Sequence, residues 1–351
     1  MADKQSLLKS AELLAEGADP LAAILAGSHP LMVEAFYLAA IPEWYDVALL
    51  DALRLRDDGR EEGLVERLAR YSFVAPLAGA PQGHPAYYIR SQERTALQRR
   101  WLAEDPAAYR AAHGRALAYW EAHPDPNPFA QAQNKVYHLL FVDFQRGIRF
   151  LLDCFRDYRN EHHLPAIERL LATARDAQSN LALLEHEMAT AFQDLLTYLT
   201  ARLAQLRGDW DGAAKLLAPL LARFNGLEPS LRPYLRRAQA YDLAQKGRYA
   251  QAIDSLKQAL REFGRPAVAG SEWGIIEAER GYTLVALGDA YVGLATAASG
   301  RGMRWPYRGG KDPRAAGLWA RLQPGLNFLV SLPLVLYLSL ALGGRVWHPR
   351  F

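Results

Sequence analysis

The chain has 351 residues, half of them apolar and 23% charged, so it has enough apolar material for more than one buried core, which argues against intrinsic disorder. Its formal charge of +3 is uneven: residues 301–351 carry a local +7, which leaves residues 1–300 slightly acidic and weakens any nucleic-acid function. With one cysteine, Cys154, and no apolar signal segment, the chain is expected in a reducing cytosolic environment.

Residues 1–123 predict a domain of short helices with one pair of strands. Asp19-Pro20 and Ser28-His29-Pro30 are typical helix starts. A helix is expected over residues 60–70, followed by a strand over 71–77, a turn-rich segment over 78–85 and a second strand over 86–89. The predicted order is therefore helix, helix, strand, wing, strand.

Two more helices are expected to start at Ser91 and at Asp105-Pro106, the second ending near Trp120. Three prolines within residues 124–128 cannot continue a helix. This segment is the expected linker to the next domain.

Residues 129–300 predict a helical repeat domain. Two units agree at five offsets, and their defining residues include Gly208, Trp210 and Ala213 in one and Gly247, Tyr249, Ala252 and Ala259 in the other. A weaker copy is expected at Gly288, where Ala290 replaces the aromatic residue, and a degenerate one starts at His162. In each unit the glycine ends the first helix, the aromatic residue wedges between helices, and the small residue permits close approach.

These residues resemble tetratricopeptide repeats (TPRs) of the longer, roughly 40-residue variety. The resemblance implies an α-solenoid over about residues 130–300. The alternative is a generic helical bundle.

Residues 31–120 resemble the winged-helix module that follows the nucleotide-binding domain of STAND-class signal-transduction ATPases. The resemblance is carried by Ile41-Pro42-Glu43-Trp44, by residues 64–74, by Tyr87-Tyr88-Ile89 and by residues 94–120. It implies a winged helix followed by TPR-like repeats, as in the arm of that class. No phosphate-binding loop occurs: the nearest string, at residues 308–312, lacks the spacing and the Mg²⁺-binding hydroxyl, so we expect no NTPase domain.

Residues 322–344 predict a transmembrane helix. These 23 residues carry no charge and extend about 34 Å as a helix, enough to cross a bilayer core of about 30 Å. Residues 301–321 form a basic juxtamembrane segment and 345–351 a short tail, so positive-inside logic places residues 1–321 in the cytoplasm of a single-pass protein. The residues expected at the membrane interface are Arg304, Trp305, Arg308, Trp319 and Trp347.

Two alternatives to this anchor remain open. The apolar segment can be a terminal helix buried against the repeats, or the chain can be the front part of a longer membrane protein.

No complete catalytic or metal-binding motif occurs. His186-Glu187 begins like a zinc-protease helix but has Thr190 where the second histidine belongs, and Cys154 lies among apolar residues, as a buried core thiol does. We therefore expect no enzyme activity, no cofactor and no metal.

DNA binding is the rival function for the winged-helix-like module. The expected recognition helix offers Glu61, Glu62, Glu66, Arg67 and Arg70, a net charge of −1, and the wing has no Lys or Arg. Nucleic acid is therefore an unlikely partner.

The sequence thus predicts a mainly α, non-enzymatic, membrane-anchored interaction scaffold in signalling, with a membrane-tethered winged-helix transcription regulator as the alternative. Its partner is expected to be a protein or peptide on the TPR-like face, with membrane lipid around the C-terminal helix. The candidate binding surface is one stripe on the first helix of the best repeat, formed by Tyr234, Arg237, Tyr241 and Gln245. Inter-repeat packing is the alternative role for these residues, especially for Tyr241.

Overall fold

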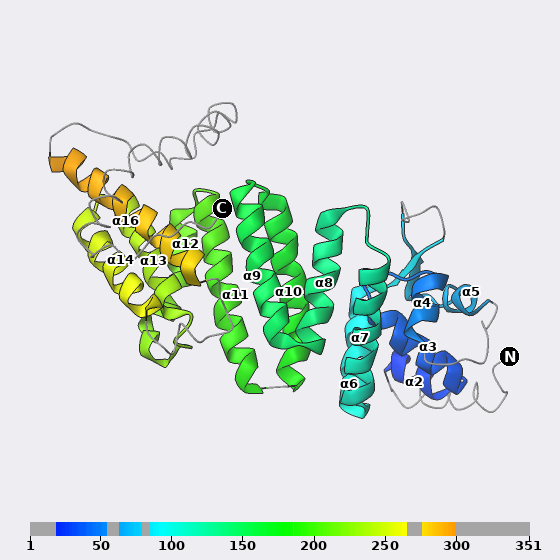
Figure 1. Ribbon diagram of the computed structural model, residues 1–351. Coiled ribbons are helices and arrows are strands. Elements are labelled where there is room, and N and C mark those ends of the chain that lie inside the picture. The colour runs from blue at the N-terminus through cyan, green and yellow to red at the C-terminus, as the bar shows by residue number, and fades with distance from the viewer. Residues whose placement is uncertain (1–18, 55–62, 79–84, 185, 265–275, 299–351) are drawn as a thin grey trace. The chain divides into compact units, whose positions relative to one another are not determined.

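The structure is a computed structural model that describes residues 19–54, 63–78, 85–184, 186–264 and 276–298. Within these ranges the chain is mainly helical, which confirms the predicted mainly α class (Figure 1). It forms two compact units, residues 1–156 with 172–189 and residues 157–171 with 190–351. The long helices α9 (Phe144–Asn160) and α10 (Leu164–Leu184) contribute residues to both.

The first unit begins with helices and a small sheet in the predicted order. The two strands are antiparallel, with Ala75 opposite Tyr88, and Tyr45 bridges to Tyr87 through two backbone hydrogen bonds of 2.8 Å. The expected wing, residues 79–84, lies outside the described residues. The elements are α2 (Pro20–Ala26), α3 (Pro30–Ala40), α4 (Val47–Leu53), α5 (Leu64–Leu68), β1 (Val74–Pro76) and β2 (Tyr87–Ile89).

Aromatic side chains join the sheet to the helices. The ring of Phe36 on α3 lies 4.7 Å from that of Tyr71 and 5.4 Å from that of Phe73, next to β1. Phe36 and Tyr45 are fully buried. Because such rings bury a large apolar area, these contacts hold the short strands against α3.

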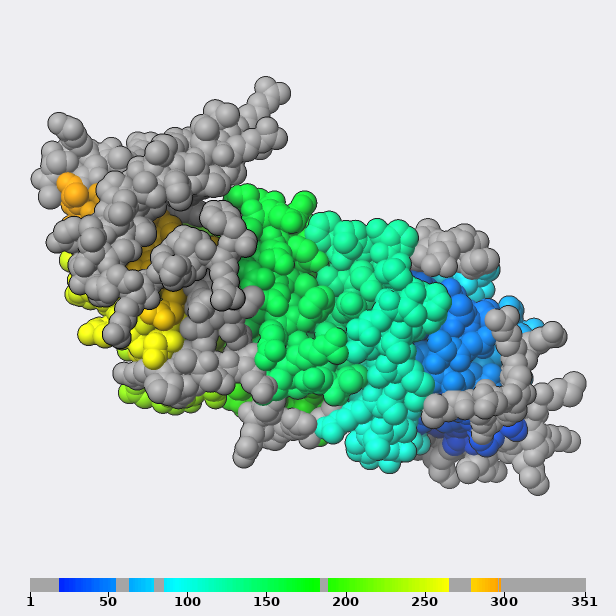
Figure 2. All heavy atoms as spheres, viewed as in Figure 1, coloured from blue at the N-terminus to red at the C-terminus, as the bar shows by residue number. Residues whose placement is uncertain are grey.

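The first unit continues with three helices: α6 (Ser91–Glu104), α7 (Pro106–Ala122) and α8 (Pro128–Val142). Asp105 and Asn127 cap the last two, each side chain accepting a hydrogen bond from a backbone N–H. Since α8 packs on α7, the proline-rich residues 124–128 lie inside this unit. In Figure 2 the atoms of these helices, coloured cyan to green, form a closely packed surface.

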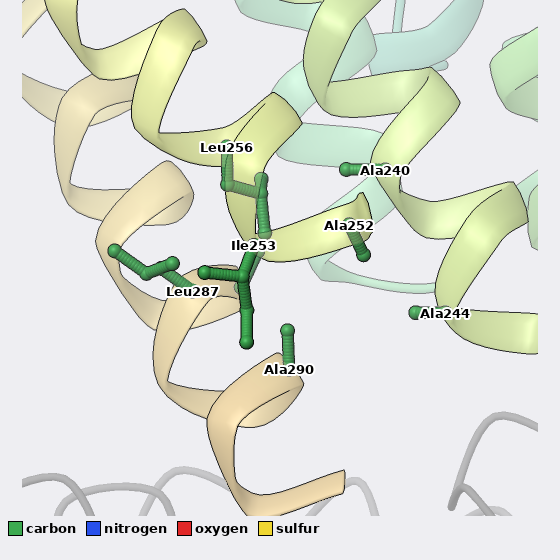
Figure 3. Packing of buried hydrophobic residues seen from close by; sticks show 8 residues of the cluster. Ala240, Ala244, Ala252, Ile253, Leu256, Leu287 and Ala290 are labelled. Atoms are coloured by element: carbon green, nitrogen blue, oxygen red, sulfur yellow. The ribbon is translucent and has the colours of Figure 1, made fainter. Parts of the chain in front are cut away.

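The second unit contains α11 (His186–Leu206), α12 (Trp210–Ala222), the short 3₁₀ helix η2 (Phe224–Gly226), α13 (Arg232–Gln245), α14 (Tyr249–Phe263) and α16 (Ile276–Ala298). Helix α14 packs against both α13 and α16. Their shared core consists largely of alanine with a few larger residues (Figure 3): Ala240, Ala244, Ala252, Ile253, Leu256, Ala286, Leu287 and Ala290. Small side chains let the helix axes approach closely.

The same turn ends α9, α11 and α13. Gly208 and Gly247 have φ of 79° and 72°, and His162 takes the same left-handed conformation at 59°. In each turn the next residue's N–H bonds the carbonyl five residues back: His163 to Tyr158, Asp209 to Ala204, and Arg248 to Leu243, at 2.8–2.9 Å. This is the Schellman motif, so His162 stands in the position that glycine occupies in the other two turns.

The prediction of a repeat unit at Gly288 is wrong, because this glycine lies inside the continuous helix α16 and does not end a helix. The small residue that matters in α16 is Gly293. A Cβ atom there would lie 2.4 Å from the Tyr249 ring, so its absence makes room for the aromatic residue of the preceding repeat unit.

Among the described residues, no helix combines the length and apolar character needed to cross a bilayer. The predicted span, residues 322–344, lies outside them, as do its flanking residues 301–321 and 345–351 and the interface residues Arg304, Trp305, Arg308, Trp319 and Trp347.

Candidate partner-binding face

The stripe predicted on α13 is engaged with neighbouring helices of the second unit. Tyr234 packs edge-on against Tyr198 of α11 and Phe263 of α14, at ring distances of 6.0 and 5.2 Å. Tyr241 lies beneath the Arg202 guanidinium of α11, 4.5 Å from ring centroid to Cζ. Tyr234 and Tyr241 therefore pack between helices, which is the alternative role that the sequence left open.

Arg237 is the buried centre of this stripe, with only 2% of its surface exposed. Its Nη2 forms an ion pair with the Glu279 carboxylate of α16, and its Nη1 donates to the Glu279 carbonyl at 3.1 Å. Burial alone would lower the pKa of Arg237, but the charge of Glu279 raises it overall. Its Nε is buried without a hydrogen-bond partner, as is Nε2 of Gln245 at the end of α13.

Arg202 is buried without a carboxylate. It is 8% exposed, and its single hydrogen bond to a described residue runs from Nη1 to Oε1 of Gln205, whose amide donates to the Ala238 carbonyl at 3.0 Å. Burial lowers the pKa of Arg202, and the positive charges of Arg237 and Arg159 lower it further. A desolvated cation normally requires an anionic partner, because its burial costs several kcal/mol.

A third arginine, Arg159 at the end of α9, is partly buried and, like Arg202, lies over a tyrosine ring without a carboxylate partner among the described residues. Its guanidinium lies 4.5 Å from the Tyr282 ring centroid of α16, and its hydrogen bonds go to the amide oxygen of Asn160. We call Arg159, Arg202 and Arg237 the arginine cluster. Glu279 is the carboxylate that pairs with the cluster among the described residues, so the four side chains carry a net +2.

The repeat-defining residues shape the helices that carry this face. Ala213, Ala252 and Ala259 are fully buried, and Trp210 and Tyr249 are each partly buried at the start of a helix. Gly208 and Gly247 set the turns. These residues position helices and take no part in the arginine cluster.

The first unit contains a buried polar network that the sequence did not reveal. Gln98 of α6 donates to the Ala40 carbonyl at 2.6 Å and to the Tyr137 hydroxyl at 3.0 Å, while Asn180 of α10 donates to Gln98 at 2.7 Å. Arg94 forms an ion pair with Asp176 at 3.1 Å. These residues span more than eighty positions with no regular spacing, so no motif indicates them.

Two histidines lie at the edge of this network. Nδ1 of His113 on α7 and Nδ1 of His138 on α8 are 3.0 Å apart, and both side chains are buried. One ring must donate and the other accept, because two protonated Nδ1 atoms would repel each other. Burial lowers the pKa of both, to about 3 for His138, and the charge of Arg94 adds to the effect.

Within the described ranges no group of three or more His, Cys, Asp or Glu side chains can hold a metal ion. Cys154 is buried in α9, as expected. Comparison with protein-family models, with curated proteins and with solved structures found no match.

Proposed function

We propose that this chain is a non-enzymatic protein–protein interaction scaffold, in which TPR-like helix pairs bind a protein or peptide partner. One observation carries the proposal: the same turn ends α9, α11 and α13, and the arginine cluster draws one residue from each of these three helices. Such pairs, stacked in register, gather their first helices on one face, which is the surface that repeat proteins use to bind partners.

Photo-crosslinking in the native host tests this face. A benzoylphenylalanine at Tyr282, which is partly buried beside Arg159, is expected to crosslink a discrete partner. Lys215 on α12 and Asp254 on α14 are exposed positions on second helices and serve as matched controls. Equal crosslinking from all three positions, or none from Tyr282, would contradict the proposal.

The scaffold is further proposed to act at a membrane in signalling, anchored by residues 322–344, with residues 1–321 in the cytoplasm. The uncharged 23-residue stretch supports the anchor. We expect the full chain to stay in the membrane during carbonate extraction and a chain ending at Arg321 to be released. Release of both would overturn the anchor and favour a terminal helix buried in the core.

The winged-helix-like module of residues 1–123 is proposed to serve as a packing surface. Its order of α3, the Tyr45 bridge, α4, α5, β1 and β2 also supports the alternative, a membrane-tethered transcription regulator. That alternative requires salt-dependent binding of duplex DNA by the full chain. The sequence of the expected recognition helix opposes it, since Glu61, Glu62 and Glu66 outweigh its two arginines.

A further inference from the structure

The arginine cluster is an incomplete electrostatic arrangement. Two of its three guanidinium groups, those of Arg159 and Arg202, have no carboxylate partner among the described residues, although Arg202 is more than nine-tenths buried. Ordinary proteins pair such groups, because a desolvated, unpaired cation opposes folding. An unpaired buried cation is therefore a feature that stability alone does not explain.

Several hydrogen-bond donors in and near the cluster have no partner among the described residues. The Tyr241 and Tyr282 rings each lie 4.5 Å below a guanidinium, so the faces of Arg202 and Arg159 are covered while their N–H edges remain for an anion. Nε of Arg237, in a side chain only 2% exposed, is a buried donor without a partner, and Nε2 of Gln245 is another. These unsatisfied donors are an observation independent of the net charge.

We propose that the arginine cluster binds a carboxylate of an acidic segment of the partner protein, with Arg202 as its principal donor. Arg202 and a carboxylate can form two parallel N–H···O bonds, and Arg159 supplies a second positive charge. The assignment rests on the proposed function, since it names the chemistry of the partner that the scaffold binds. It places the point of recognition at α9, α11 and α13.

The test uses the full chain and two fluorescein-labelled probes. One is a ten-residue peptide of alternating Glu and Ala with a free C-terminus; the other has Gln in place of Glu and an amidated end. Fluorescence anisotropy is expected to show that the acidic peptide binds at least tenfold more tightly than the Gln peptide. Arg202→Gln is expected to weaken binding of the acidic peptide at least tenfold. Arg159→Gln is a second variant in case Arg202→Gln does not fold. It is expected to weaken binding of the acidic peptide at least threefold.

Arg207→Gln is the matched control, because it removes one positive charge directly after the same helix, at an exposed position paired with Glu168. It is expected to change binding by less than twofold. Equal losses from Arg207→Gln and Arg202→Gln would overturn the site and indicate general charge attraction. If inorganic phosphate binds through Arg202 and the acidic peptide does not, the proposal that the cluster binds a peptide carboxylate is wrong.

Failure of this inference is distinguishable from failure of the proposed function. If neither probe binds while benzoylphenylalanine at Tyr282 still crosslinks a partner, the scaffold stands and the acidic chemistry is wrong. If the acidic peptide binds through Arg202 but no partner is crosslinked, the carboxylate site stands and the scaffold function is wrong.

Discussion

His162 adopts the left-handed backbone conformation at the end of α9, where the two equivalent turns have glycine. A residue with a Cβ atom is destabilised in this conformation by about 1–2 kcal/mol. Replacing it with glycine removes this strain but also increases the entropy of the unfolded chain, which offsets part of the gain. His162→Gly is therefore expected to stabilise the second unit by about 0.5–1 kcal/mol, measured by urea unfolding.

Gly247→Ala is the reverse change at an equivalent turn. It is expected to destabilise the second unit by about 1 kcal/mol, because the left-handed backbone conformation is unfavourable for alanine. No steric clash contributes, since no atom would lie within 4 Å of the new Cβ. A destabilising His162→Gly would show that the exposed imidazole has a role beyond the turn.

The His113–His138 pair predicts acid sensitivity of the first unit. Both pKa values are lowered by burial, so the unfolded chain binds protons more readily than the folded one as the pH falls below about 6.5. The stability that neutral imidazoles provide is present above pH 6.5 and is lost as the pH falls. Since each histidine contributes about 2 kcal/mol, we expect a loss of about 4 kcal/mol between pH 7.5 and 5, seen as faster hydrogen exchange in α7 and α8 after correction for intrinsic rates.

The double variant His113→Phe with His138→Leu is the control for that prediction, since it removes both titrating groups from a site lined by Tyr109 and Phe141. Its hydrogen exchange in α7 and α8 should change much less between pH 7.5 and 5. An unchanged pH dependence would assign the acid sensitivity to other residues.

Asp289 on α16 predicts the opposite pH dependence in the second unit. Burial raises its pKa to about 6, so the protonated form stabilises the fold at low pH and this contribution is lost as the pH rises through 6. Asp289→Asn is expected to stabilise by about 1–2 kcal/mol at pH 7.5 and by little at pH 4. Asp254→Asn, at an exposed position on α14, should have little effect at either pH; urea unfolding measures both.

At the scale of the element, two glycines of α16 predict opposite effects. Gly293→Ala would place a Cβ 2.4 Å from the Tyr249 ring and is expected to destabilise by about 1–3 kcal/mol, because the rigid ring must shift. Gly281→Ala meets nothing within 4 Å and should stabilise by up to about 1 kcal/mol through helix propensity. Thermal unfolding of the two variants checks the packing of α14 on α16.

Individual elements were predictable where local chemistry determines them. Asp19-Pro20 and Asp105-Pro106 start helices, and Gly208 and Gly247 end them, because capping and left-handed turns depend on neighbouring residues. Gly288 misled the prediction, since a glycine inside a helix has the same sequence signal as one that ends it. The two cases differ in the structure, where α16 continues ten residues beyond Gly288 to Ala298.

The candidate site was predictable only in part for a related reason. Periodicity placed Tyr234, Arg237, Tyr241 and Gln245 on one face of a helix, but periodicity does not show what that face contacts. Arg202 and Arg159 were missed, because they reach this face from α11 and α9, far away in the sequence. Charge pairing across helices is a tertiary property.

At the scale of the whole molecule, the division into two units depends on packing that no linker signal reveals. The prolines of residues 124–128 predicted a boundary, yet α8 follows them directly and packs on α7. The Gln131 amide also donates to the Trp120 carbonyl at 2.7 Å, which ties α8 to the end of α7. A proline-rich segment fixes local backbone geometry, whereas a domain boundary requires the absence of such contacts.

The central claim is that the binding face contains a cation whose partner is an anion from another protein. Its most direct test is the thermal unfolding of the full chain and of Arg202→Met, each with and without the alternating Glu–Ala peptide. Without peptide, the variant is expected to unfold about 2–4 °C higher, because methionine fills a similar volume without a buried, unpaired charge. The peptide should raise the unfolding temperature of the wild type and leave that of the variant unchanged. A variant that unfolds at a lower temperature, with neither protein responding to the peptide, would contradict the account.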